Sequence, residues 1–286
     1  MTDPLFRDIS DTARWTAAFR ASETARPDAA FKDPFAARLA GEWGEAHAQQ
    51  LRERLEYGWP FVARTYLFDR FVTRLVEHGV DLIVNLAAGL DTRPYRMALP
   101  SSLRWVEVDL PDILDYKEEI LGDAQPACEV ERVRLDLTNQ DARRGLFSRL
   151  GRSAQHVAVL SEGLIVYLMP QAVAELARDL AAPPTFDYWL IDLASRRALD
   201  LMRERLGDVM EEAGAPFLFA PADGAAFFDQ YGWRAHESRS LMRTAGKLGR
   251  LPLSLRMLAT LPEPSGDVSE RQWSAVVLLT RQQQHA

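Results

Sequence analysis

The chain has 286 residues, of which 47% are apolar and 26% charged, a composition typical of a folded globular protein. Its net charge of −7 argues against nucleic-acid binding, because contact with the phosphate backbone requires a clustered positive surface. The single cysteine, Cys128, excludes an internal disulfide and indicates a reducing compartment. No stretch approaches the roughly 18 apolar residues that span a bilayer, and residues 1–20 lack the apolar core of a signal peptide. We therefore expect a soluble, cytoplasmic protein without membrane attachment.

The first part of the chain predicts a helical cap. Residues 1–58 contain polar helical and irregular stretches interrupted by prolines, and they show no strand pattern. From residue 59 apolar side chains recur at helical spacing until Gly79, which is a typical stop signal. Residues 81–86 then form a short apolar run, as in a buried parallel strand. The main domain is expected over residues 59–286.

Strand-like and helical segments then alternate for about 130 residues. Further strand-like runs lie at residues 104–108, 132–135, 157–160 and 186–191. Pro170 predicts the start of the helix after the fourth strand, because proline is favoured in the first turn of a helix. This alternation predicts a doubly wound, Rossmann-like α/β sheet with helices on both faces.

The pattern changes after the fifth strand. Residues 199–213 form an amphipathic helix, and residues 273–280 are typical of a late strand. We expect a helical insertion over about residues 199–264, before that last strand. Its apolar residues, which lie mainly between 217 and 261, are compatible with core packing, with the seam of a homodimer, or with the wall of a pocket for an apolar molecule.

Small and acidic residues follow the first two strands. Ala87, Ala88 and Gly89 form a turn with little side chain, so a ligand can approach the backbone closely. Asp109 ends the second strand, at the position from which a carboxylate accepts hydrogen bonds from both ribose hydroxyls of an adenosine group. A nicotinamide oxidoreductase uses the same geometry, but its fingerprint needs three glycines around a pyrophosphate. The single glycine of this turn favours S-adenosylmethionine.

The third and fourth strands end in the same way. Asp136 and Leu137 follow the third strand, where the carboxylate would bind the adenine amino group and the leucine would pack on the ring. Alternatively, Asp136 is the N-cap of the next helix. Glu162 follows the fourth strand. Since ligands bind beyond the carboxyl ends of strands in open α/β sheets, the coincidence of four such ends predicts a binding site there.

Four ordered strings carry a family resemblance: VART at 62–65, NLAAGLDTR at 85–93, VEVDLP at 106–111 and SEGLIVYL at 161–168. Together they resemble the leucine carboxyl methyltransferase family, which includes bacterial O-methyltransferases of secondary metabolism. The resemblance implies a seven-stranded class I methyltransferase sheet, with the strand at 273–280 antiparallel near one edge. It also implies S-adenosyl-L-methionine as cofactor, with Asp109 on the ribose and with Asp136 and Leu137 on the adenine.

The resemblance assigns the methionine end of the cofactor as well. Arg64 matches the arginine that grips the methionine carboxylate in relatives, a role that suits a planar guanidinium. Glu162 matches an acidic residue beside the methionine, and Gly89 with Ala87 matches the cofactor turn. Ala87 departs from the family, which often has glycine there; a positive φ would make alanine costly. Arg20 is the nearest candidate for a basic cofactor contact in the N-terminal arm, although its spacing is inexact.

The acceptor of the methyl group is less well specified. A carboxylate is already ionised at neutral pH, whereas a phenol benefits from a general base. His47, His236 and Tyr167 are the candidates for such a group, and this scarcity of bases favours a carboxylate. We expect a small-molecule acceptor and no metal. The alternatives are a protein C-terminal carboxylate, a nicotinamide oxidoreductase on the same fold, and a binding protein that has lost catalysis.

Overall fold

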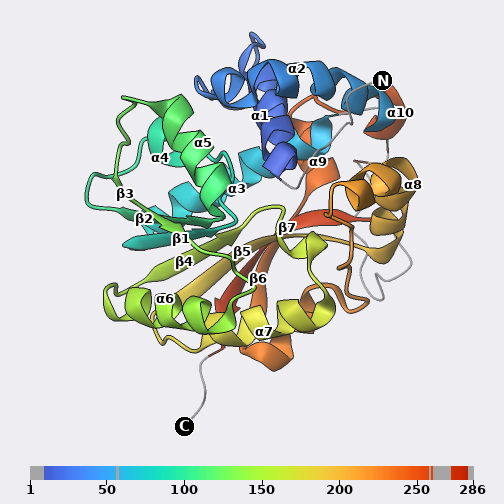
Figure 1. Ribbon diagram of the computed structural model, residues 1–286. Coiled ribbons are helices and arrows are strands. Elements are labelled where there is room, and N and C mark those ends of the chain that lie inside the picture. The colour runs from blue at the N-terminus through green and yellow to red at the C-terminus, as the bar shows by residue number, and fades with distance from the viewer. Residues whose placement is uncertain (1–9, 56–57, 258, 260–271, 283–286) are drawn as a thin grey trace.

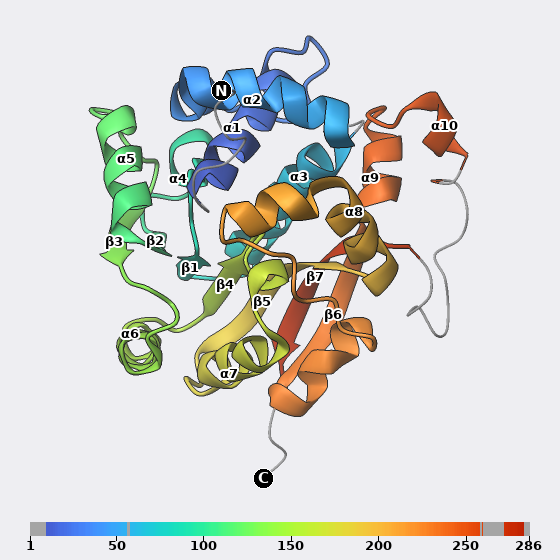
Figure 2. The ribbon, with the colours of Figure 1, turned by 45° about the vertical axis from the view of Figure 1, so that its right-hand side comes forward.

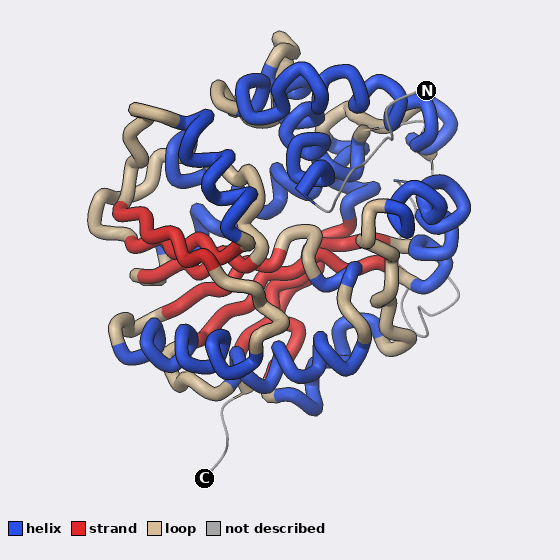
Figure 3. Tube along the Cα trace, viewed as in Figure 1, coloured by secondary structure: helices blue, strands red, loops and turns tan. Residues whose placement is uncertain are grey.

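A computed structural model describes residues 10–55, 58–257, 259 and 272–282 of the chain, without the side chains of residues 10–11, 45 and 47–55. The described part consists of a central sheet with helices on both faces and a helical layer over one end of the strands (Figure 1). Figure 3 shows the sheet as a continuous layer between two layers of helices.

The sheet has seven strands in the order β3-β2-β1-β4-β5-β7-β6. The strands are β1 (Leu82–Leu86), β2 (Arg104–Asp109), β3 (Glu129–Arg134), β4 (Val157–Ser161), β5 (Phe186–Ala194), β6 (Trp233–Ser240) and β7 (Ser274–Arg281). Strands β1 to β5 are parallel to one another, and β7 lies between β5 and β6 and is antiparallel to both. The predicted doubly wound, seven-stranded sheet with an antiparallel late strand is therefore confirmed.

The helices alternate with these strands. They are α1 (Ser10–Thr24), α2 (Ala36–Leu55), α3 (Trp59–Glu77), α4 (Arg93–Arg96), α5 (Pro111–Leu121), α6 (Gln140–Arg152), α7 (Pro170–Ala181), α8 (Arg196–Glu212), α9 (Leu241–Lys247) and α10 (Leu253–Arg256), with 3-10 turns η1 (Ile165–Tyr167) and η2 (Gly224–Tyr231). Pro170 occupies the first turn of α7, as predicted. Within the described residues, no helix is both long enough and apolar enough to cross a bilayer.

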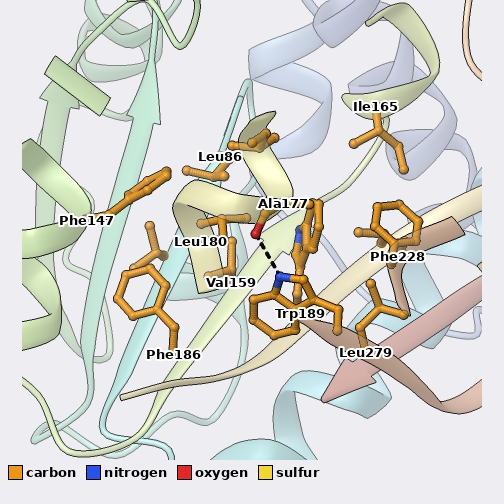
Figure 4. Packing of buried hydrophobic residues seen from close by; sticks show 14 of the residues in the cluster. Leu86, Phe147, Val159, Ile165, Ala177, Leu180, Phe186, Trp189, Phe228 and Leu279 are labelled. Atoms are coloured by element: carbon orange, nitrogen blue, oxygen red, sulfur yellow. Dashed lines mark hydrogen bonds between the residues drawn. The ribbon is translucent and has the colours of Figure 1, made fainter. Parts of the chain in front are cut away.

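The core divides into two layers because side chains alternate between the faces of a strand. On one face, β1, β4 and β5 pack against α6, α7 and η2; this core includes Phe147, Phe186 and Trp189 (Figure 4). Trp233 of β6 donates from its indole Nε1 to the carbonyl of Ala177 in α7, at 2.9 Å. On the other face, the alternate strand residues pack against α3 and α9.

The N-terminal helices cover the carboxyl ends of the strands. Trp15 and Phe19 of α1 pack in one apolar cluster with α8 residues such as Leu206. Ala17 and Leu39 join α1 and α2 in another cluster that reaches α5. Figure 2 shows α1, α2 and α8 on the same side of the sheet. Helices α1, α2 and α8 thus form a layer over the strand ends.

One segment differs from the sequence-based expectation. Trp233–Ser240, within the expected helical insertion, is the edge strand β6. Only Trp233 of it is buried, so it lacks the alternating apolar pattern that reveals a half-buried strand. Cys128 lies in the loop before β3 and is buried in the core of the α3 face. Burial raises the pKa of its thiol to about 11, which leaves it unreactive at neutral pH.

Candidate functional site: a cavity at the carboxyl ends of the strands

A cavity of about 740 Å³ lies over the carboxyl ends of β1, β2, β4 and β5. The strand order reverses between β1 and β4, and ligands of open α/β sheets bind at such a reversal. Residues of α1, α3 and α8 complete the wall. The volume lies within the range of small-molecule and cofactor pockets.

The turn after β1 forms one wall of the cavity. Ala87 has a φ of +50° and Gly89 a φ of +48°; the left-handed region is easy for glycine but strained for alanine. The backbone N–H of Gly89 donates to Asp109 Oδ2 at 2.6 Å, and that of Leu110 donates to Asp109 Oδ1 at 2.8 Å. The turn and the end of β2 are thus locked together by one carboxylate.

Asp109 is a constrained acceptor at the cavity wall. Burial raises the pKa of its carboxyl group in spite of the two backbone donors. Each oxygen of a carboxylate has two lone-pair directions, and each oxygen of Asp109 uses one for the backbone. The remaining capacity of Asp109 suits two vicinal hydroxyl groups.

The end of β3 contributes Asp136 and Leu137 to the same cavity. Asp136 is exposed, and its Oδ1 accepts from the backbone N–H and the hydroxyl of Thr138, both at 2.8 Å. Asn139, not Asp136, is the N-cap of α6, since its side chain accepts from the N–H of Ala142. The alternative interpretation of Asp136 as an N-cap is therefore wrong.

Arg64 projects from α3 between the ends of β4 and β5. Its Nε lies 3.1 Å from Glu162 Oε1, and its Nη1 lies 3.1 Å from Asp192 Oδ2. Asp192 also accepts from the N–H of Gly163 at 2.7 Å, and Glu162 Oε2 lies 2.8 Å from Arg93 Nη2. Although burial disfavours the charged form of Glu162, Arg93 and Arg64 hold the pKa of this carboxyl group below its usual value.

Further ion pairs surround Arg93, which follows the turn after β1. Arg93, whose side chain is 3% exposed, also binds Asp91 at 2.8 Å and Asp69 at 2.7 Å. Burial disfavours the charged form of Asp91, but Arg93 and other neighbouring cations lower the pKa of its carboxyl group to about 2. Asp69 in turn holds Arg96 at 2.7 Å. This network holds Asp91 and Glu162 in the ionised form.

Hydrogen bonds connect the N-terminal cap to the segment that follows β1. Arg20 of α1 donates to Asp33 at 2.8 Å and to the carbonyl of Leu90 at 2.6 Å, and the hydroxyl of Thr92 donates to Asp33 at 2.7 Å. Arg20 lines the cavity, as the resemblance suggested, but these two contacts also give it a structural role. Ala13 of α1 lies close enough to the turn that a Cβ on Gly89 would meet it at 3.4 Å.

The structure describes the side-chain surroundings of two of the three candidates for a general base. His236 lies exposed on the edge strand β6 and is not among the residues that line the cavity. The side chain of His47, in α2, lies outside the described residues. Tyr167 lines the cavity and stacks on Phe217 with ring centroids 5.7 Å apart. Burial raises the pKa of Tyr167 to about 12, so its hydroxyl stays protonated at neutral pH.

The cavity wall therefore brings together Arg64, Ala87, Gly89, Asp109, Asp136, Leu137, Glu162 and Tyr167. The sequence analysis had not singled out Asp192, Asp91 or Arg93 as site residues. Asp192 was detectable by the rule already applied to the other strands, because it lies near the carboxyl end of β5. The partners of Arg93 are not visible in the sequence, since contacts with Asp69 and Glu162 depend on the packing of α3 and β4 around the turn.

The strand order, the antiparallel β7 and the cavity at the strand ends define the architecture of class I methyltransferases. Residues 13–181 match the model of the leucine carboxyl methyltransferase family. The chain belongs to that family.

Individual relatives agree with this placement. A protein of Parafrankia sp. assigned as an S-adenosyl-L-methionine-dependent methyltransferase is 35% identical over 252 residues, which cover 80% of this chain and 78% of the relative. A protein of Mycolicibacterium paratuberculosis with the same assignment is 32% identical over 265 residues, 84% of each chain.

Solved structures share the fold at low sequence identity. A protein of Thermobifida fusca assigned as a methyltransferase has a TM-score of 0.60 and 17% identity, with coverage of 98% of this chain and 97% of that chain. A DUF574 family protein of Streptomyces avermitilis has a TM-score of 0.58 and 15% identity, covering 93% and 96% of the two chains. Both carry the same architecture over nearly their whole lengths.

Proposed function

We propose that this protein transfers a methyl group from S-adenosylmethionine to an oxygen of a small molecule, with a carboxylate as the preferred acceptor. The observation that carries the proposal is the single cavity in which the turn after β1 and Asp109 adjoin both an ionic cluster and an apolar chamber. The family and the assignments of the relatives support the cofactor.

The residues at the strand ends fit this cofactor. Asp109 retains acceptor capacity for two ribose hydroxyls, beside a turn whose backbone is open to close approach. Asp136 and Leu137 offer a carboxylate and an apolar surface to the adenine ring. Arg64 uses Nε and Nη1 for its two acidic partners, and a guanidinium has further N–H donors for the methionine carboxylate. When bound, the cofactor supplies a methyl group on a positively charged sulfur.

The protein would act mainly by positioning. Arg93 and Arg64 hold Glu162 ionised and fixed in orientation, and residues of α1 and α8 line the cavity above the strand ends. Holding two reactants in line supplies several kcal/mol of a displacement barrier, without any covalent step by the protein.

The acidic and aromatic groups of the cavity favour an acceptor that arrives already ionised. No histidine is found among the described residues that line the cavity. Glu162 and Asp91 have lowered pKa values, and Tyr167 has a raised one, so none of the three is suited to remove a proton from a phenol at neutral pH. A carboxylate acceptor needs no such base.

A nicotinamide oxidoreductase is less compatible with the turn. The dinucleotide fingerprint places three glycines around a pyrophosphate, whereas here Ala87 and Ala88 precede the one glycine. A protein C-terminal carboxylate stays a second acceptor candidate, because it presents the same chemical group to the cavity.

Calorimetric titration of the whole chain with S-adenosylmethionine, S-adenosylhomocysteine and NADH tests the cofactor directly. We expect the two adenosyl compounds to bind and NADH not to bind. For the acceptor, single-turnover rates with labelled cofactor and a panel of small acids and phenols are measured from pH 6 to pH 9. A carboxylate with a pKa near 4 gives a nearly flat profile, and its methyl ester releases methanol in mild alkali. Tight NADH binding would overturn the proposed cofactor. An alkali-stable ether, formed at a rate that rises steeply with pH, would overturn the proposed carboxylate acceptor.

A further inference from the structure

Helix α8 presents one face to the cavity, and that face contains a single charge. The cavity-lining residues of the helix follow the i, i+3, i+4, i+7, i+8 spacing of one helical face: Ala198, Leu201, Met202, Arg205 and Leu206. Every other charged residue of α8 is exposed, whereas Arg205 is half-buried. Arg205 is thus the one charged residue that α8 contributes to the cavity lining.

The chamber that α8 faces is apolar. Its other walls include Phe61 of α3, Phe217, and Leu241 and Met242 at the start of α9. Among the described residues, Arg205 is the one charged side chain that α8, α9, α10 and the segment around Phe217 contribute to the lining. An apolar body of the acceptor fits this chamber, because its surface is removed from water on binding.

The opposite half of the cavity is acidic. Its carboxylates outnumber its guanidiniums; the carboxylates are Asp91, Asp109, Asp136, Glu162 and Asp192, and the guanidiniums are Arg20, Arg64 and Arg93. Most charged side chains at the strand ends therefore repel an acceptor anion, and Arg64 is already assigned to the carboxylate of the cofactor. A positive group on the chamber side offsets this repulsion and holds a carboxylate in a defined orientation.

We propose that Arg205 is the specificity-determining residue of the acceptor half of the site, and that it selects acceptors that combine an apolar body with a carboxylate. The inference rests on the proposed methyltransferase function and names the acceptor class for it. It does not require Arg205 to lack a partner within the protein, because a guanidinium has enough N–H donors to bind a protein acceptor and a ligand carboxylate together.

Binding of defined probes tests the inference. The protein is first saturated with S-adenosylhomocysteine, whose own affinity is recorded, and is then titrated with octanoate, 2-naphthoate and the two corresponding amides. We expect at least one acid to bind and to bind more tightly than its amide. Arg205→Met weakens acid binding roughly ten- to hundredfold, as loss of a charge-assisted hydrogen bond predicts. Arg205→Lys restores part of it.

Arg197→Met is the matched control, because it removes the same charge from an exposed position of the same helix. We expect it to leave acid binding unchanged, and we expect both variants to keep the wild-type affinity for S-adenosylhomocysteine. Equal binding of acids and amides, absence of binding by either acid, or an Arg205→Met variant within twofold of wild type would overturn the inference while the cofactor titration still supported the proposed function. If the wild type did not bind S-adenosylhomocysteine, the proposed function itself would be overturned.

Discussion

The strained turn after β1 makes a sharp prediction about stability. Among the described non-glycine residues, Ala87 alone has a positive φ, at +50°. An L-residue with a Cβ in this region is strained by about 1–2 kcal/mol, and glycine is not. Ala87→Gly is therefore expected to relieve strain at the wall of the cavity.

The net effect is smaller than the strain. Glycine makes the unfolded chain more flexible, which lowers stability by about 0.4–1 kcal/mol. We expect the free energy of unfolding of the apo protein to rise by about 0.5–1 kcal/mol, the difference between these two effects. The neighbouring Ala88 is 6% exposed and has no positive φ, so Ala88→Gly has the entropic cost without the relief. It also loses a buried methyl group worth about 0.8 kcal/mol.

Urea denaturation of the wild type and the two variants, followed by circular dichroism, measures the contrast. The two alanine-to-glycine substitutions should change the free energy of unfolding in opposite directions and differ by about 2 kcal/mol. If Ala87→Gly destabilised the protein as much as Ala88→Gly does, the left-handed conformation at Ala87 would not be strained, and the reasoning would fail.

Three further predictions concern the carboxylates. Asp109→Ala should weaken S-adenosylmethionine binding roughly ten- to 150-fold by calorimetry, whereas Asp112→Ala at an exposed position of α5 should not. Asp91 has a folded-state pKa of about 2 against an ordinary 3.8, so Asp91→Asn should remove about 2 kcal/mol of stability at pH 7. That difference should shrink as the pH falls below about 4; a loss independent of pH would contradict it. Asp33→Ala should cost about 3–5 kcal/mol in urea denaturation, because it leaves the guanidinium of Arg20 without its ion-pair partner; unchanged stability would refute this role.

The predictability of each strand depended on its burial. All five residues of β1 and all five of β4 are buried, so their apolar runs stood out in the sequence. β6 has alternating charge and a single buried residue at an edge of the sheet, where cross-strand pairing with β7, rather than an apolar pattern, makes it a strand. Periodicity arguments detect burial, and they fail where most residues of a strand are exposed and backbone pairing holds it in the sheet.

The site was predictable in position but not in its connections. Small and acidic residues at the strand ends mark where a ligand binds, since topology brings those ends together. Their protonation and orientation depend on contacts across the chain: Arg64 meets Glu162 across 98 positions and Asp192 across 128. Likewise, the identity of residue 87 raised the question of a positive φ, but only the backbone geometry answers it.

The ion-pair network also bears on what the acceptor must supply. Glu162 shares Arg64 and Arg93, and Asp192 binds Arg64 and the N–H of Gly163. Arg64 and Arg93 keep Glu162 stable as an anion, so it orients a bound cation well but accepts a proton poorly. Glu162 and Asp91, which stay ionised, and Tyr167, which stays neutral, therefore have little capacity for proton transfer at neutral pH. This supports the proposal that the acceptor oxygen enters the cavity already charged. The role proposed for Arg205 rests on the same requirement for an anionic acceptor.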